Sequence, residues 1–325
     1  MKNNFKKSVF LIVIVVLVCS LLASVSLAKD GFKIGVVVKS LGNPFFREIC
    51  YGAKEQGERY GAEVIIQATA HEGMILEQID LIENLIQTGI DGLVITPQNS
   101  EGIAPAIISA KKAGIPCIVV DTFAENVELD AYLGMDNIEA GKKVAKLVCE
   151  KLGGEGNIAI IEGMAGASSS ILRSEGFRQG CAEYPGIKIV ADQNADFRRD
   201  VGQRVMADIL QANKIDGILC ANDLMALGAI VSLQEAGYKI GGDGGVVIGS
   251  YDISDEILEA VKADEVLVTG YHWGKVQGRW GVDLCMDLLN GQPVPNNTIT
   301  PHTEITAENV DWYLDFARML KKYKF

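Results

Sequence analysis

The segment IDGLVITP, residues 90–97, decides the fold, because it returns as IDGILCAN at residues 215–222. Three further matches have nearly the same spacing: GAEVII (61–66) with GIKIVA (186–191), KIGVVV (33–38) with NIAIIE (157–162), and Gly52 with Gly176. Self-similarity at one fixed spacing is typical of duplicated structural units. We therefore predict two copies of one domain.

Short apolar runs rich in valine and isoleucine alternate with stretches of helical spacing from Lys33 onward. The runs are apolar throughout, as expected for parallel strands that are covered on both faces. This alternation predicts the α/β class, with two similar lobes built on open, doubly wound parallel sheets. The predicted strands are residues 33–38, 62–67, 91–96, 116–121, 157–162, 187–192, 216–221, 245–250 and 266–271.

The composition limits the classes of function. The chain has 325 residues, 48% of them hydrophobic, which suits a globular protein of two domains. Its 42 acidic residues outnumber its 30 basic residues, and it has no long run of like charge. Because nucleic acids attract positively charged surfaces, we expect no nucleic-acid partner.

The first 28 residues differ in kind from the rest. Lys2, Lys6 and Lys7 precede an apolar stretch, and Ser26 to Ala28 offers small residues where a signal peptidase cuts. This order is typical of a secretory signal peptide, so we predict cleavage after Ala28 and an extracytoplasmic location. The alternative is an uncleaved anchor, because residues 8–28 are long enough to span a bilayer.

Six cysteines follow the predicted signal, at positions 50, 117, 149, 181, 220 and 285. They form no C-x-x-C motif and have no histidine close by in sequence, so we expect no metal site. Buried free thiols are our prediction. Oxidation of one pair in an exported protein is the alternative.

Aromatic and polar side chains follow the predicted strands. In open parallel sheets, ligands bind outside the carboxyl ends of the strands. If these ends of the two copies face each other, one cleft is lined from both sides. The candidate ligand-binding residues at the strand ends are Asn43, Phe45, Phe46, Asp121, Phe197, Asn222, Asp252 and His272.

This mixture of side chains suits a neutral, polyhydroxylated ligand. Aromatic rings pack on the C–H faces of a sugar, while carboxylates and amides form hydrogen bonds with its hydroxyls. Phe45 and Phe46 are neighbours in a predicted helix and point about 100° apart, so one core-facing side cannot bury both. Two candidates have a second interpretation: Asn222 as a helix N-cap, and His272 as a buried hinge residue.

Five motifs together resemble the ribose/galactose-type periplasmic sugar-binding proteins of ABC transporters. They are NPFF (43–46), AGASSSILRSEGF (165–177), ADF (195–197), ANDLMALGA (221–229) and the G-x-x-D of residues 249–252. The resemblance covers the chain after the signal and implies a type I, Venus-flytrap fold whose two lobes are joined by a three-stranded hinge. The lobes would comprise residues 30–134 with 273–300, and residues 135–272 with 301–325.

The resemblance assigns ligand contacts to Asn43, Phe45, Phe46, Asp121, Phe197, Asn222 and Asp252. The chain departs from the ribose-binding pattern at four positions: Thr96 replaces an asparagine, Thr122 and Ile171 replace arginines, and His272 replaces a glutamine. Two bidentate donors are absent, which disfavours ribose itself. We expect a less hydroxylated sugar, a polyol or a cyclitol, and we keep Thr96, Thr122 and Ile171 as further candidates.

The resemblance implies a monomeric solute-binding protein that delivers a small sugar or polyol to an ABC permease. The alternatives are a membrane-anchored or chemotaxis-linked sugar sensor, which would contact a chemoreceptor, and a receptor for a non-sugar small molecule. We expect no enzymatic activity and no cofactor, because the sequence contains neither G-x-x-x-x-G-K-[ST] nor G-x-S-x-G.

Overall fold

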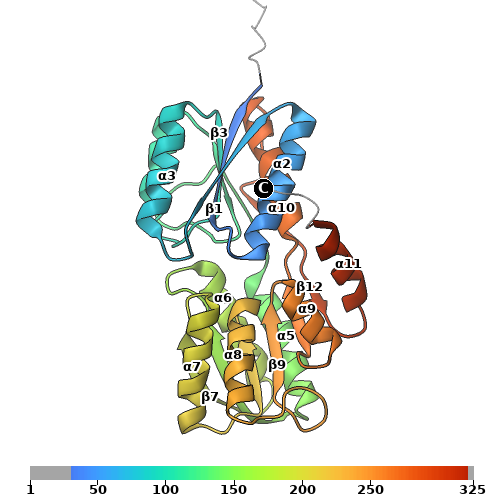
Figure 1. Ribbon diagram of the computed structural model, residues 1–325. Helices are drawn as coiled ribbons and strands as arrows, with labels where there is room; N and C mark the ends of the chain where they lie inside the picture. The colour runs from blue at the N-terminus through green and yellow to red at the C-terminus, as the bar shows by residue number, and fades with distance from the viewer. Residues whose placement is uncertain (1–30, 321–325) are drawn as a thin grey trace, which may run out of the picture. The chain divides into compact units, whose positions relative to one another are not determined.

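The structure is a computed structural model that describes residues 31–320 of the chain. The predicted signal peptide, residues 1–28, lies outside the described residues. From Lys33 onward, the described chain forms two sheets of six strands each, with helices on both faces of each sheet (Figure 1). This arrangement confirms the predicted α/β class.

The first sheet is parallel throughout. Its strands, in spatial order, are β11 (Asn297–Ile299), β5 (Ala131–Gly134), β4 (Cys117–Val120), β3 (Gly92–Ile95), β1 (Lys33–Ser40) and β2 (Glu63–Thr69). The central strands carry valine and isoleucine that are fully buried, as expected where helices cover both faces.

The second sheet repeats this order. Its strands are β12 (Thr303–Ile305), β10 (Val268–Tyr271), β9 (Val247–Tyr251), β8 (Gly217–Cys220), β6 (Glu155–Glu162) and β7 (Gly186–Asn194). Only β12 runs antiparallel to its neighbour within this sheet of the described chain. The equal order of the two sheets confirms the duplication predicted from the repeat.

All nine predicted strands are present, with ends that shift by up to two residues. Three strands were missed: β5, β11 and β12. They are only three or four residues long, and β11 alternates between exposed and half-exposed positions. The strands β11 and β12 carry too few apolar residues for a pattern to stand out, and β5, AYLG, lacks the valine and isoleucine that mark the other strands.

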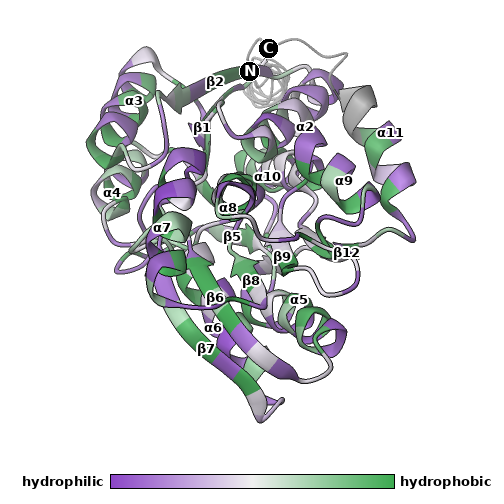
Figure 2. Ribbon diagram, turned by 60° about the horizontal axis from the view of Figure 1, so that its bottom comes forward, coloured by the Kyte–Doolittle hydropathy of each residue, from purple (hydrophilic) through white to green (hydrophobic). Residues whose placement is uncertain are grey.

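Helices pair closely on the faces of the sheets. The described helices are α2 (Pro44–Tyr60), α3 (Ile75–Thr88), α4 (Ala104–Lys112), α5 (Asn137–Lys151), α6 (Ser168–Ala182), α7 (Arg199–Ala212), α8 (Asp223–Glu235), α9 (Asp255–Lys262), α10 (Gly274–Leu289) and α11 (Val310–Leu320). Figure 2 shows hydrophobic residues along strands such as β6, while the helices carry hydrophilic residues on their outer sides.

Repeated glycines allow two of these helix pairs to approach. On α2, a Cβ at Gly52 would collide with the backbone carbonyl of Lys275 on α10. On α6, a Cβ at Gly176 would collide with the backbone carbonyl of Ile138 on α5. The Gly52–Gly176 match in the sequence repeat therefore marks equivalent helix contacts in the two halves.

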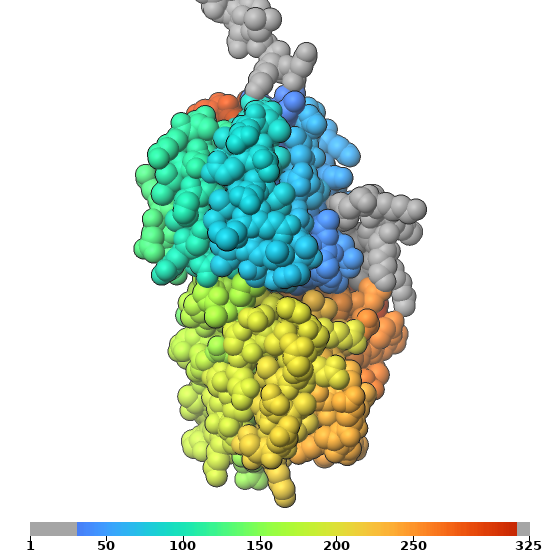
Figure 3. Space-filling model, turned by 60° about the vertical axis from the view of Figure 1, so that its left-hand side comes forward, coloured from blue at the N-terminus to red at the C-terminus, as the bar shows by residue number. Residues whose placement is uncertain are grey.

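The described chain passes between the sheets three times: after β5, after β10, and between β11 and β12. Helix α10 consequently packs on the first sheet, although it follows β10 of the second. Figure 3 shows the lobes in contact, with atoms from the N-terminal half meeting those coloured yellow-green to orange. These passages bring the carboxyl ends of both sets of strands together.

The six cysteines of the described residues are free and buried, as predicted. The Sγ atoms of Cys149 and Cys181 lie 3.9 Å apart between α5 and α6. Within residues 31–320, no helix has the length and apolar character needed to cross a membrane.

Candidate functional site

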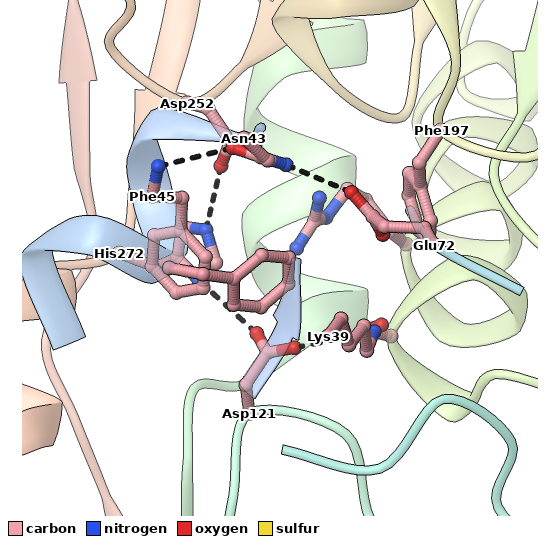
Figure 4. Close-up of a pocket in the computed structure, with 11 residues that line it drawn as sticks. Lys39, Asn43, Phe45, Glu72, Asp121, Phe197, Asp252 and His272 are labelled. Atoms are coloured by element: carbon pink, nitrogen blue, oxygen red, sulfur yellow. Dashed lines mark hydrogen bonds and ion pairs between the residues drawn. The ribbon is translucent and has the colours of Figure 1, made fainter. Parts of the chain in front are cut away.

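One pocket lies where the strand ends of the two lobes meet (Figure 4). It contains about 250 Å³ of space that protein atoms do not fill, part of it continuous with solvent. Seven of the predicted site residues line it: Asn43, Phe45, Phe46, Asp121, Phe197, Asp252 and His272. Four lining residues were not predicted as contacts: Lys39, Glu72, Ser169 and Arg173.

The two adjacent phenylalanines both face this pocket from the first turn of α2. Asn43 caps the helix, because its Oδ1 accepts a hydrogen bond from the backbone N–H of Phe45 at 3.0 Å. Both rings are buried, and their centroids lie 5.2 Å apart in an edge-to-face arrangement. Phe45 also stacks on His272, with ring centroids 3.8 Å apart and planes inclined by 14°.

Asp121 and Asp252 come from equivalent strand ends. Asp121 directly follows β4 of the first lobe, and Asp252 directly follows β9 of the second. Both have a positive φ, of 65° and 75°, which aspartate tolerates better than most residues but which is uncommon. Backbone strain of this kind concentrates at ligand sites, where the surrounding structure enforces it.

His272 joins these two aspartates. Its Nε2 lies 2.7 Å from Oδ1 of Asp252, and its Nδ1 lies 3.5 Å from Oδ1 of Asp121. Burial lowers the pKa of His272 to about 3, and the nearby Arg173 cation acts in the same direction. The imidazole is therefore neutral. In the tautomer that donates from Nε2 to Asp252, Nδ1 is an acceptor without a protein donor.

Lys39 is the first residue that the sequence reasoning missed. It is 1% exposed at the carboxyl end of β1. Its Nζ donates a hydrogen bond to Oγ1 of Thr122 at 2.7 Å and lies 3.7 Å from Oδ2 of Asp121. Its backbone N–H donates to Oγ1 of Thr96 at 3.1 Å. Lys39 directly follows the predicted strand 33–38, but a single lysine at that place usually faces solvent, so it was not chosen as a candidate.

Glu72 is the second pocket residue that the sequence reasoning missed. It lies three residues beyond β2 and is buried, and one of its carboxylate oxygens accepts a hydrogen bond from Nδ2 of Asn43 at 3.1 Å. Burial raises its pKa to about 7. Burial likewise raises the pKa of Asp252 to about 7. Inspection of the residues after every predicted strand, the second strand included, would have found Glu72.

Arg173 fixes the second lobe's side of the pocket. Its guanidinium donates hydrogen bonds to the backbone oxygen of Ala221, at 2.5 Å, and to Oδ1 of Asn137, at 3.0 Å. It also lies 4.3 Å from the ring centroid of Tyr251, a cation–π distance. Its Nε has no hydrogen-bond partner within the described protein.

Four predicted site residues do not line the pocket. Asn222 caps α8 through Met225 and donates from Nδ2 to the backbone oxygen of Phe197 at 3.1 Å, so it positions that ring. Thr96 and Thr122 both accept hydrogen bonds from Lys39. Ile171, by contrast, is 51% exposed, so its side chain meets solvent.

Serine side chains connect the two lobes beside the pocket. The backbone N–H of Ser168 donates to Oγ of Ser100 at 3.0 Å, and Oγ of Ser168 accepts from the backbone N–H of Phe123 at 2.8 Å. The hydroxyls of Ser169 and Thr122 lie 2.9 Å apart. These contacts hold the lobes in a closed arrangement around the lining residues.

The comparisons with known proteins agree on one family. Residues 34–293 match the family model described as a periplasmic binding protein domain. The ribose import binding protein of Bacillus subtilis is 31% identical over 84% of this chain and 87% of its own length. A xylitol-binding protein of Mycolicibacterium smegmatis is 30% identical over 87% of this chain and 79% of its own length.

A solved structure shares the fold. It is a periplasmic solute-binding protein of an ABC transporter from Actinobacillus succinogenes, with bound D-allose. The two chains are 31% identical with a TM-score of 0.80, over 87% of this chain and all of that one.

Proposed function

We propose a function from one premise: the chain belongs to the periplasmic binding protein family. The protein captures a small neutral sugar or polyol between its two lobes, outside the cytoplasm, and delivers it to the permease of an ABC importer. It acts as a monomeric receptor and releases its ligand unchanged, so it is not an enzyme. Residues 1–28 are the signal peptide that directs its export.

One observation carries this proposal: Asp121 and Asp252, from opposite lobes, line the same pocket and meet at His272. A ligand held by both aspartates contacts both lobes only when they are closed. Differential contact of this kind shifts the equilibrium toward the closed form. The permease then recognises the surface of the closed form.

The charges in the pocket suit a neutral ligand with many hydroxyls. Lys39 and Arg173 are cations, and Asp121, Asp252 and Glu72 are carboxyl groups. The carboxyl groups accept hydroxyl protons, while the cations donate to hydroxyl oxygens. Because both signs are present, neither a strongly anionic nor a strongly cationic ligand would be favoured.

A thermal-shift screen of residues 29–325 tests the function. The panel comprises pentoses, hexoses, acyclic polyols, inositols and amino acids. A ligand at about 100 times its dissociation constant adds roughly 2.7 kcal/mol of stability and raises the melting temperature by a few degrees. A hit among neutral polyhydroxylated compounds is expected, whereas hits confined to amino acids would contradict the proposal.

A further inference from the structure

The ammonium of Lys39 lies near one aromatic ring from each lobe. Nζ is 5.6 Å from the ring centroid of Phe46 in the first lobe and 5.4 Å from that of Phe197 in the second. Both distances fall within the range of cation–π attraction. Lys39 therefore occupies space beside both rings that would otherwise be open to a ligand.

Lys39 is held in this place at both ends. Its backbone N–H is bound by Thr96, and its Nζ is bound by Thr122 beside the carboxylate of Asp121. Thr122 in turn meets the hydroxyl of Ser169 from the second lobe. These contacts fix the side chain, so Lys39 forms part of the pocket wall.

The aromatic rings therefore already have protein groups against them. Phe46 and Phe197 have the Lys39 ammonium, and Phe45 has the imidazole of His272. Phe197 is also packed so closely against Gly163 that a Cβ there would collide with the ring. A sugar ring that stacked on Phe46 or Phe197 would compete with the Lys39 ammonium for that ring.

Lys39 lines the space that remains in the pocket. About 250 Å³ is not filled by protein atoms, and part of this is continuous with solvent. A ligand in this space has to pass around the ammonium, which a flexible chain does more easily than a rigid six-membered ring.

The unused hydrogen-bonding capacity also fits a chain of hydroxyls. Lys39 has three N–H donors and one hydrogen-bonded acceptor, Thr122, together with the more distant Asp121. Nε of Arg173 and Nδ1 of His272 have no hydrogen-bond partners within the described protein. Each hydroxyl of a polyol can donate and accept, so a short chain can satisfy these groups in sequence.

We infer that Lys39 sets the specificity of the pocket for a small acyclic polyol of four or five carbons, and that it excludes pyranose sugars. This inference rests on the proposed function, since it concerns the same pocket.

Titration calorimetry tests it, with erythritol, xylitol, D-ribose and D-allose as the probes. In the unaltered protein, one of the two polyols should bind at least tenfold more tightly than either sugar. Lys39→Ser removes the ammonium and enlarges the pocket, so it should reduce that preference at least tenfold. Lys39→Met keeps most of the length without the charge, so it should weaken polyol binding without improving D-allose binding.

Lys151→Ser, at an exposed lysine near the end of α5, is the matched control and should leave all four affinities unchanged. Tighter binding of D-ribose or D-allose by the unaltered protein would overturn the inference while leaving the proposed function in place. A polyol preference that survives Lys39→Ser would overturn the role of Lys39. If no probe binds and the thermal-shift screen gives no polyhydroxylated hit, the proposed function fails as well. Should the serine variant not fold, the unaltered protein and Lys39→Met still decide the outcome.

Discussion

Asp121 and Asp252 occupy equivalent positions in the two halves of the chain. Each is the first residue after its strand, and each has a positive φ. His272 lies between their carboxyl groups, 2.7 Å from Asp252 and 3.5 Å from Asp121. Duplication has thus placed one acceptor from each lobe on the same pocket, where a ligand can bind both.

Substitution of either aspartate should weaken ligand binding. A hydrogen bond to a charged group contributes about 1.5–3 kcal/mol, so Asp121→Asn and Asp252→Asn should each raise the dissociation constant roughly 10- to 100-fold. Titration calorimetry with the best ligand of the thermal-shift screen measures this. Asp208→Asn, at an exposed position of α7, is the control. Unchanged affinity in both pocket variants would remove the aspartates from the site.

Glu48 should make the protein less stable as the pH rises. It is buried on α2 and accepts a hydrogen bond from the hydroxyl of Tyr271, at the end of β10, at 2.6 Å. Burial raises the pKa of Glu48 to about 8. Its contribution to stability is therefore fully present below the unfolded pKa of about 4.5 and is lost as the pH rises toward 8.

Urea unfolding of the unaltered protein and of Glu48→Gln between pH 4.5 and 8 measures this contribution. One pKa unit corresponds to about 1.4 kcal/mol, so the free energy of unfolding of the unaltered protein should fall by several kcal/mol relative to the variant. His272, with its lowered pKa, acts in the opposite direction below pH 6.5 in both proteins. Parallel curves for the two proteins would contradict the assigned pKa of Glu48.

The serine contacts between the lobes should favour closure. Ser168→Ala removes the acceptor for the backbone N–H of Phe123, a loss of about 1 kcal/mol or roughly fivefold in the closed population. The radius of gyration from X-ray scattering should rise in the absence of ligand, and the apparent dissociation constant should increase. Ser109→Ala, on α4, provides a comparison away from this contact. Identical scattering from Ser168→Ala and the unaltered protein would show that these contacts do not govern closure.

Most of the architecture could be predicted from the sequence, because the same pattern of strands and helices occurs twice along the chain. Buried strands such as β3 and β8 are uniformly apolar, so their pattern is strong even at four residues. The strands β11 and β12 next to the interlobe passages were missed, since their short sequences are held by pairing with β5 and β10. Local pattern cannot reveal a strand whose stability comes from its neighbours.

Only part of the pocket could be predicted, because some of its residues are buried through contacts that are distant in sequence. Residues that directly follow a strand, such as Asp121 and Asp252, can be found by position alone. Lys39 directly follows the predicted strand 33–38 but was passed over, because its burial depends on Thr122 and on Phe197 of the other lobe. Ile171 was chosen by motif position, yet its side chain is half exposed. Side-chain direction within the first turn of α6 was not evident from the sequence.

A crystal structure of residues 29–325 with the best ligand of the thermal-shift screen tests the central claim most directly. We predict one ligand per chain, with hydroxyls within hydrogen-bond distance of both Asp121 and Asp252 and with the lobes closed around it. A ligand that contacts only one lobe, or that binds away from these two aspartates, would contradict the account.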